Sequence, residues 1–128
     1  MLWLWVFMLV VNLLLSVSMM GFGRAFVKSP PKQVNDYFGY RTAMSTKNKD
    51  TWSFAHRYFG RIWFVLGIIT TVAVAVVFLI LLEKSIDTVG KVGGICAMLQ
   101  CVLLIAPILP TERALRKTFD RWGNRMGK

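Results

Sequence analysis

The residues best suited to chemistry lie in one polar segment, residues 35–60, between two long apolar runs. The segment contains Gly39-Tyr40-Arg41-Thr42, in which the guanidinium of Arg41 offers a planar fork of donors. Such a fork suits a phosphate, a carboxylate or several carbonyls. Gly39 can adopt backbone conformations that are barred to its neighbours, which favours a turn at this point. The chemistry indicated here is recognition rather than bond making.

Catalytic chemistry has little support elsewhere in the chain. The sequence has no nucleophile paired with a base, no phosphate-binding loop and no metal-ligand cluster. His56 is the single histidine, and a lone histidine at a membrane interface is usually a polar surface residue. Cys96 and Cys101 are five residues apart in an apolar run, which predicts small apolar packing residues rather than a metal or redox site. We therefore expect no enzyme activity, no metal and no cofactor.

Three apolar runs must position the polar segment. Residues 1–22, 62–82 and 89–109 each supply the roughly 20 residues that a helix needs to cross a hydrocarbon core. Hydrophobic residues make up 55% of the chain and charged residues only 17%. We expect one all-α membrane domain over residues 1–128. No span carries an acidic residue at depth, which argues against a minimal transporter or channel.

Sixteen basic residues against six acidic ones give a net charge of +10. The basic residues gather in the loop over residues 24–61 and in the tail after Pro110. The positive-inside rule places both segments in the cytoplasm and the N-terminus outside. Topology and attraction to anionic lipid account for this charge, so nucleic acid is not expected as a partner.

Two surface helices are predicted on the basic side. In the loop, Ser29-Pro30-Pro31 ends the first helix, and Asn48 is a suitable N-cap for a helix that leads to the second span. Trp52, Ala55 and Phe59 share one face of that helix, and His56 is expected elsewhere on its wheel. In the tail, residues 111–126 predict a basic amphipathic helix. Thr111 would be its N-cap and Glu112 would lie in its first turn; its apolar stripe would be Leu115, Phe119, Trp122 and Met126.

Polar and small residues in the spans indicate how the helices meet. Asn12 and Ser16 share a helix face, and Gln100 needs a buried partner, for which Asn12 is a candidate. The second and third spans are expected to form a tight antiparallel hairpin. Gly90 and Gly94 have the GxxxG spacing, and Gly93 and Ala97 repeat it with small residues. This face serves either the bundle or a homo-oligomer, of which we favour the bundle.

An ion pair is predicted between the loop and the tail. The carboxylates on the basic side are surrounded by Lys and Arg, and they are Asp36, Asp50, Glu112 and Asp120. The specific hypothesis pairs Arg41 with Glu112 or with Asp120.

Fixed spacings mark both the polar segment and the tail. The segment reads Asn35-x3-Gly39-Tyr40-Arg41-Thr42-x2-Ser45-x2-Asn48-x2-Thr51-Trp52-x2-Ala55-x4-Gly60, and the tail reads Thr111-Glu112-x2-Leu115-x3-Phe119-Asp120-x2-Gly123-Asn124-Arg125. Together they resemble the SdpI/YfhL family of small bacterial membrane proteins, over roughly residues 30–128. The chain resembles the three-span C-terminal half of the family's namesake.

The resemblance implies a function in the bacterial cytoplasmic membrane. The namesake is an immunity protein that protects cells from a secreted killing peptide, and it is also a membrane receptor that sequesters a cytoplasmic repressor. The implied partners are the lipid bilayer, a membrane-active toxin peptide and a cytoplasmic repressor. The main alternative is a structural or interaction subunit of a membrane complex. The candidate functional residues are Asn35, Gly39, Tyr40, Arg41, Thr42, Ser45, Asn48, Trp52, Glu112 and Asp120.

Overall fold

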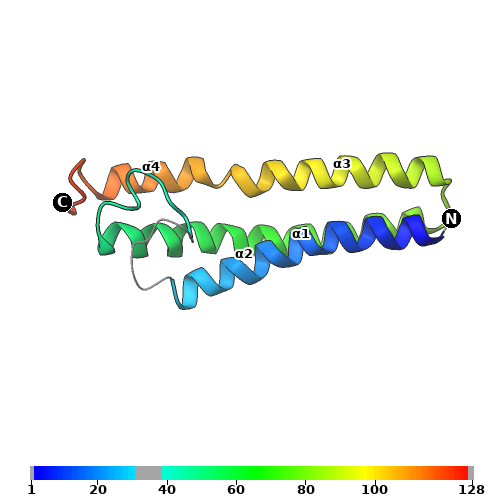
Figure 1. Cartoon of the computed structure of the whole chain (residues 1–128), viewed down its shortest axis with the longest axis horizontal. Helices are drawn as coiled ribbons and strands as arrows, with labels where there is room; N and C mark the ends of the chain where they lie inside the picture. The colour runs from blue at the N-terminus through cyan, green and yellow to red at the C-terminus, as the bar shows by residue number, and fades with distance from the viewer. Residues whose placement is uncertain (1, 31–38, 127–128) are drawn as a thin grey trace.

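The computed structural model describes residues 2–30 and 39–126, and over these residues the fold is helical. The elements are α1 (Leu2–Lys28), α2 (Lys49–Ile80), the short 3₁₀ helix η1 (Leu81–Glu83), α3 (Ile86–Ile105) and α4 (Ile108–Thr118). Figure 1 shows α1 and α2 side by side, with α3 and α4 following one another along a third line. Three helical stretches are long and apolar enough to cross a membrane, which confirms the predicted fold class. The orientation of the spans stays a prediction.

Helix α1 packs against α2 through direct backbone contact. Gly23 faces Gly60 and Phe64, and a Cβ placed on Gly23 would collide with the backbone of Phe64. A Cβ on Gly67 would lie 2.6 Å from the backbone nitrogen of Met20. Small residues at these positions allow the two helices to approach closely, as is usual between membrane helices. Helix α1 ends at Lys28, as the Ser29-Pro30-Pro31 sequence predicts.

Helix α2 is one continuous rod of 32 residues. Asn48 is its N-cap, as predicted: the side chain accepts a hydrogen bond from Thr51 N, and the Thr51 hydroxyl accepts one from Asn48 N. This reciprocal capping box satisfies two amide groups that would otherwise lack helical partners. The predicted surface helix therefore runs straight into the second span.

Helix α3 packs mainly on α1. Gly93 contacts the side chain of Met8, and Asn12 donates a 3.3 Å hydrogen bond to Gly93 O. Gln100 Nε2 donates to Asn12 Oδ1 over 2.8 Å, so the predicted partnership of these two residues is confirmed. The expectation that the small-residue face serves the bundle is therefore confirmed for Gly93, whereas Gly90 and Gly94 have open space where a Cβ would lie.

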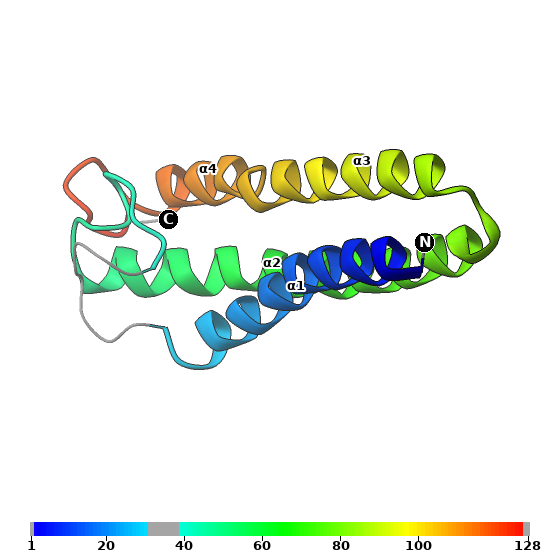
Figure 2. The ribbon, with the colours of Figure 1, turned by 45° about the vertical axis from the view of Figure 1, so that its right-hand side comes forward.

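The tight antiparallel hairpin expected of α2 and α3 is only partly right. The two helices are antiparallel and joined by a short turn, but each makes far more contacts with α1 than with the other. The physical reason is that the small residues Gly67 and Gly93 both face α1, where they allow close approach. Figure 2 shows α1 lying along α2, with α3 and α4 on a separate line.

The predicted tail helix over residues 111–126 is only partly right. Helix α4 begins at Ile108 and ends at Thr118, and Thr111 is not its N-cap, since its hydroxyl donates to Pro107 O. Proline is tolerated in a first helical turn because its missing N–H has no intrahelical partner there. Beyond Thr118 the chain forms a turn that is closed by a bridge between Phe119 and Arg125. Leu115 and Phe119 of the predicted stripe are buried, whereas Trp122 and Met126 are exposed.

Candidate functional site

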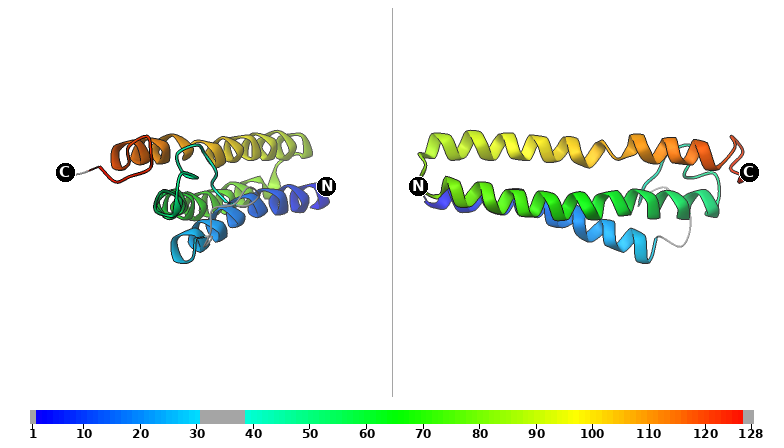
Figure 3. Two further views of the ribbon diagram at one scale, coloured as in Figure 1. Left: turned by 60° about the vertical axis from the view of Figure 1, so that its left-hand side comes forward. Right: turned by 180° about the vertical axis from the view of Figure 1, so that it is seen from behind.

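Residues 39–48, the start of α2 and residues 119–126 of the tail converge at one end of the bundle (Figure 3). An apolar cluster lies beneath them and joins all three. Its buried members are Phe26, Tyr40, Ala55, Phe59, Leu115 and Phe119. We call the polar residues that cover this cluster the polar cap, and they are Gly39, Tyr40, Arg41, Thr42, Ser45, Asn48, Thr51, His56 and Glu112.

Glu112 on α4 is the central acceptor of the polar cap. Its Oε2 accepts hydrogen bonds from the Tyr40 hydroxyl at 2.6 Å and from the Thr42 hydroxyl at 2.7 Å. Hydrogen bonds to a carboxylate are about twice as strong as those between neutral groups. Burial, together with the neighbouring Glu112, raises the pKa of Tyr40 well above its usual range. Tyr40 therefore remains a neutral donor.

A tight turn holds the two donors in place. Ser45 Oγ accepts a hydrogen bond from Thr42 N at 2.8 Å and donates to Tyr40 O at 3.0 Å. Thr42 Oγ1 in turn accepts one from Ser45 N at 3.1 Å. Ser45 is fully buried. The side chain of Ser45 thus holds the backbone of Tyr40 and Thr42, and the side chain of Thr42 holds the backbone of Ser45.

His56 anchors the same turn from α2. Its Nε2 lies 2.9 Å from Tyr40 N, and its Nδ1 lies 2.8 Å from Trp52 O. An amide N–H can only donate and a carbonyl can only accept, so Nε2 is the acceptor and Nδ1 carries the proton. The imidazole is therefore neutral. Gly39 has φ 107°, and a Cβ there would collide with the His56 ring, so this position requires glycine.

The prediction that His56 is a surface residue is wrong, because its side chain is fully buried. Its ring lies 4.3 Å from that of Trp52 and 4.9 Å from that of Phe26, measured between centroids. The sequence held a usable indication, since His56 follows Trp52 by four residues and therefore lies on the same face of α2.

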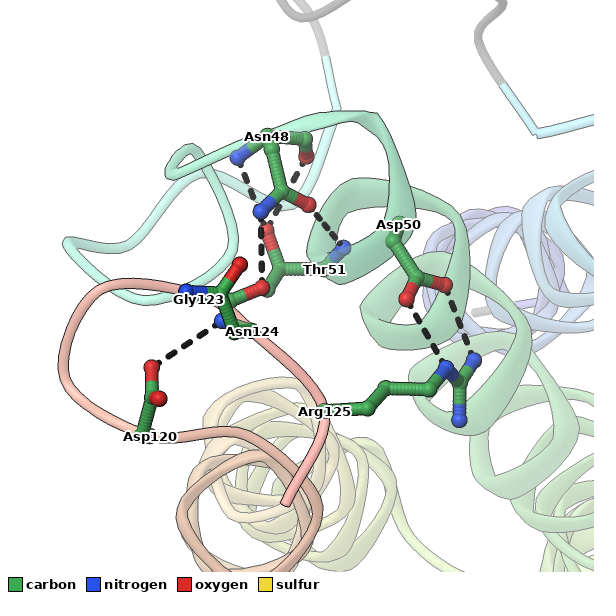
Figure 4. Close-up of polar contacts among 7 residues, drawn as sticks. All are labelled: Asn48, Asp50, Thr51, Asp120, Gly123, Asn124 and Arg125. Carbon is green, nitrogen blue, oxygen red and sulfur yellow. Dashed lines mark hydrogen bonds and ion pairs between the residues drawn. The ribbon is translucent and has the colours of Figure 1, made fainter. Parts of the chain in front are cut away.

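The tail is fastened to the start of α2 by two contacts, which Figure 4 shows. Asn48 Nδ2 donates a 2.7 Å hydrogen bond to Gly123 O, and both nitrogens of the Arg125 fork lie 2.8 Å from the oxygens of Asp50. Asn48 therefore caps α2 with its oxygen and holds the tail with its nitrogen. Gly123 has φ 86°, and a Cβ on it would lie 2.7 Å from Asn48 Nδ2.

Contacts between loop and tail exist in the structure, and the pairing of Arg41 with Glu112 or Asp120 stays a prediction. Glu112 accepts from Tyr40 and Thr42, and Asp120 Oδ1 accepts from the backbone amides of Trp122 and Asn124 within its own turn. Among the described residues, Asp50 and Arg125 form an ion pair that joins the two segments. Arg41 lies between Tyr40 and Thr42 in the sequence, and it is exposed and lines a cavity.

That cavity has a volume of about 390 Å³ and lies beside the polar cap. Residues 39–42 form one wall, and aromatic and aliphatic side chains form the others. These are Phe22, Phe26, Phe59, Trp63, Leu104 and Ile108. Trp63 Nε1 donates to Leu104 O at 3.2 Å, close to the break between α3 and α4. The cavity thus presents an apolar aromatic lining next to the guanidinium of Arg41.

Nine of the ten predicted functional residues can be placed in the structure. Asn35 lies outside the described residues. Trp52 is buried beneath the polar cap, and Asp120 lies apart from it in the tail turn. The other seven form part of the polar cap. Among the described residues, no three His, Cys, Asp or Glu side chains are placed to hold a metal ion.

The fold and the polar cap define a small multi-pass membrane protein whose three apolar helices carry one polar end. The chain matches the model of the SdpI/YfhL protein family over residues 32–111. This match covers more than half of the chain, and the chain therefore belongs to that family. It includes the loop, α2, α3 and the start of α4, and it ends one residue before Glu112. No curated protein and no solved structure matches the chain.

Proposed function

We propose that the chain is a non-enzymatic immunity protein of the bacterial cytoplasmic membrane, which protects the cell against a secreted killing peptide. Family membership is consistent with this role. The observation that carries the proposal is the pairing of the polar cap with the cavity. The polar groups of Tyr40, Thr42 and Glu112 are engaged with one another, whereas the adjoining cavity of about 390 Å³ is lined by apolar rings.

The lining of the cavity suits an amphipathic peptide segment. The rings of Phe59 and Trp63 bury large apolar areas, and tryptophan in addition prefers the boundary between lipid and water. Arg41 beside them adds a positive charge to the lining of the cavity. The same end of the chain would present the sequestering surface for a cytoplasmic regulator, as the resemblance implies.

The proposal is tested by filling the cavity. Leu104 lines the cavity, whereas its neighbour Ile105 is 65% exposed and does not. Leu104→Phe and Ile105→Phe therefore form a matched pair with equal added volume. In a peptide-sensitive bacterial strain treated with a secreted peptide toxin, we expect the wild type and Ile105→Phe to protect and Leu104→Phe to protect poorly at equal membrane levels. Equal protection by both variants would show that the cavity does not take part in protection.

A second candidate function is that of an interaction subunit in a membrane complex. It is favoured by Gly90 and Gly94, which have open space on the outside of α3. Such a surface allows a neighbouring helix to approach closely. Copurification of a partner in fixed proportion, lost in Gly94→Leu but not in Ile95→Leu, would support this role.

A further inference from the structure

One face of α4 carries a basic hollow that is separate from the cavity beside the polar cap. The hollow has a volume of about 460 Å³ and lies between long side chains of this one helix, which are Leu109, Glu112, Arg113, Arg116 and Lys117. Its three cations are exposed. Among the described residues, the ion pairs are Lys91–Asp87 and Arg125–Asp50, so no carboxylate there pairs with a cation of this hollow.

One carboxylate also lines the hollow, but it does not cancel the positive charge. Glu112 Oε2 receives the hydroxyls of Tyr40 and Thr42, which hold that oxygen toward the polar cap. Three positive charges stand against this single negative charge. A guanidinium binds phosphate oxygens through parallel hydrogen bonds, and an ammonium binds them as a point charge. The chemistry of the hollow therefore suits a phosphate group.

An exposed apolar stripe leads from the middle of α3 to this hollow. It includes Met98, Val102 and Leu109, which are each more than 60% exposed and recur with helical spacing. The stripe is continuous because α4 follows the line of α3 (Figure 1). The 11 residue steps from Met98 to Leu109 span roughly 16 Å, close to the half-thickness of about 15 Å of a hydrocarbon core. The stripe therefore matches the length of one lipid acyl chain.

The direction of α4 brings its cations to the lipid headgroups. The Cα–Cβ bonds of a helix tilt toward its N-terminus. Helix α4 begins at Ile108, next to the end of the stripe, so Arg113 and Arg116 lean back toward the bilayer. These residues lie about 6 and 10 Å beyond Leu109 along the helix axis. The headgroup region is about 5–8 Å thick on each side of the bilayer, so both long side chains reach it.

We propose that this face of α4 binds a single anionic phospholipid, whose phosphate occupies the hollow and whose acyl chain lies along the stripe. Arg113 and Arg116 donate to the phosphate oxygens, and Lys117 adds its charge. The inference goes beyond the proposed function, because it assigns the chain a lipid ligand in addition to a peptide. General attraction of basic segments to an anionic leaflet depends on the number of cations, whereas this site depends on which cations are present.

The test is a lipid titration of the full chain in detergent micelles, followed by native mass spectrometry. The probes are phosphatidylglycerol, which is anionic, and phosphatidylcholine, whose choline cation the basic hollow repels. We expect the wild type to bind one phosphatidylglycerol at saturation and to bind phosphatidylcholine at least about ten-fold more weakly. Equal affinity for the two lipids, or binding of phosphatidylglycerol that never saturates, would overturn the proposal.

Two matched double variants locate the site. Arg113→Gln/Arg116→Gln removes two charges from the hollow, and Arg57→Gln/Arg61→Gln removes two exposed charges from α2 at the same end of the bundle. Helix α2 begins at Lys49, beyond these arginines, so they lean away from the bilayer. We expect the affinity for phosphatidylglycerol to fall about ten- to thirty-fold in the α4 variant and less than about three-fold in the α2 variant. Equal losses would show that only total charge matters and would overturn the proposal.

A second measurement tests the position of the acyl chain. The full chain is placed in phosphatidylcholine vesicles with a small fraction of phosphatidylglycerol that carries a photoreactive diazirine in its acyl chain. We expect labelling to concentrate on residues 98–109 of the wild type and to lose this preference in Arg113→Gln/Arg116→Gln. Labelling that is spread evenly over the exposed faces of the three spans would contradict a bound lipid at this place.

Discussion

The hydroxyl of Tyr40 donates a 2.6 Å hydrogen bond to Oε2 of Glu112, which lies 72 positions further along the chain. This bond joins the loop before α2 to the last helix. The two residues approach one another because α2 and α3 are antiparallel, so that the chain returns to the end of the bundle from which it left. The same carboxylate oxygen also receives the hydroxyl of Thr42.

Removing the hydroxyl of Tyr40 should therefore destabilise the polar cap. A hydrogen bond to a charged group contributes about 1.5–3 kcal/mol, and the partial exposure of Glu112 reduces this to about 1–2 kcal/mol. We expect Tyr40→Phe to lose stability of this size in denaturant unfolding of micelle-bound protein. In the background of Glu112→Leu the same substitution should have little further effect. Additive losses in the double variant would mean that the two residues do not interact.

The ionisation of Tyr40 should be suppressed in the folded protein. Burial and Glu112 raise its pKa above the ordinary value of 10.0, so the folded state favours the neutral phenol. This contribution to stability is present in full below pH 10, and it is lost as the pH rises further, because the unfolded chain ionises first. Phenolate absorbance, compared between the wild type and Tyr40→Phe, should show no Tyr40 titration near pH 10 until the protein unfolds. A normal titration in the folded state would contradict the buried bond to Glu112.

The two contacts between tail and α2 should differ in strength. Asn48→Ala removes the helix cap and the hydrogen bond to Gly123, and we expect a loss of about 1–2 kcal/mol. Asp50→Asn breaks an ion pair whose side chains are 48% and 57% exposed, so it should barely change the melting temperature. Thermal unfolding of both variants at low and high salt would compare them. A larger loss in Asp50→Asn would show that the ion pair holds the tail.

The sequence predicted the features that depend on local pattern. The apolar runs, the break after Lys28, the Asn48 cap and the pairing of Asn12 with Gln100 all follow from composition, turn chemistry or the need of a buried amide for a partner. These preferences act within a few residues or allow few choices of partner. They can therefore be predicted from the sequence alone.

Contacts that depend on helix packing were not predictable in the same way. The fully buried position of His56 depends on the loop folding over it, through Tyr40 N and the glycine at position 39. The tail keeps an amphipathic pattern past Thr118, but Gly123 and the side chain of Asp120 stabilise a turn there instead. Helices α2 and α3 each pack on α1 rather than on one another, which no periodicity reveals.

The most direct test of the account is the survival of a peptide-sensitive bacterial strain exposed to a secreted peptide toxin. Cells would carry no chain, the wild type, Arg41→Ala or Arg57→Ala, with equal amounts of protein in the membrane. Both arginines are exposed at the same end of the bundle, but only Arg41 lines the cavity beside the polar cap. The account predicts protection by the wild type and Arg57→Ala, and loss of most protection in Arg41→Ala. A well-inserted wild-type chain that gives no protection, or full protection by Arg41→Ala, would contradict it.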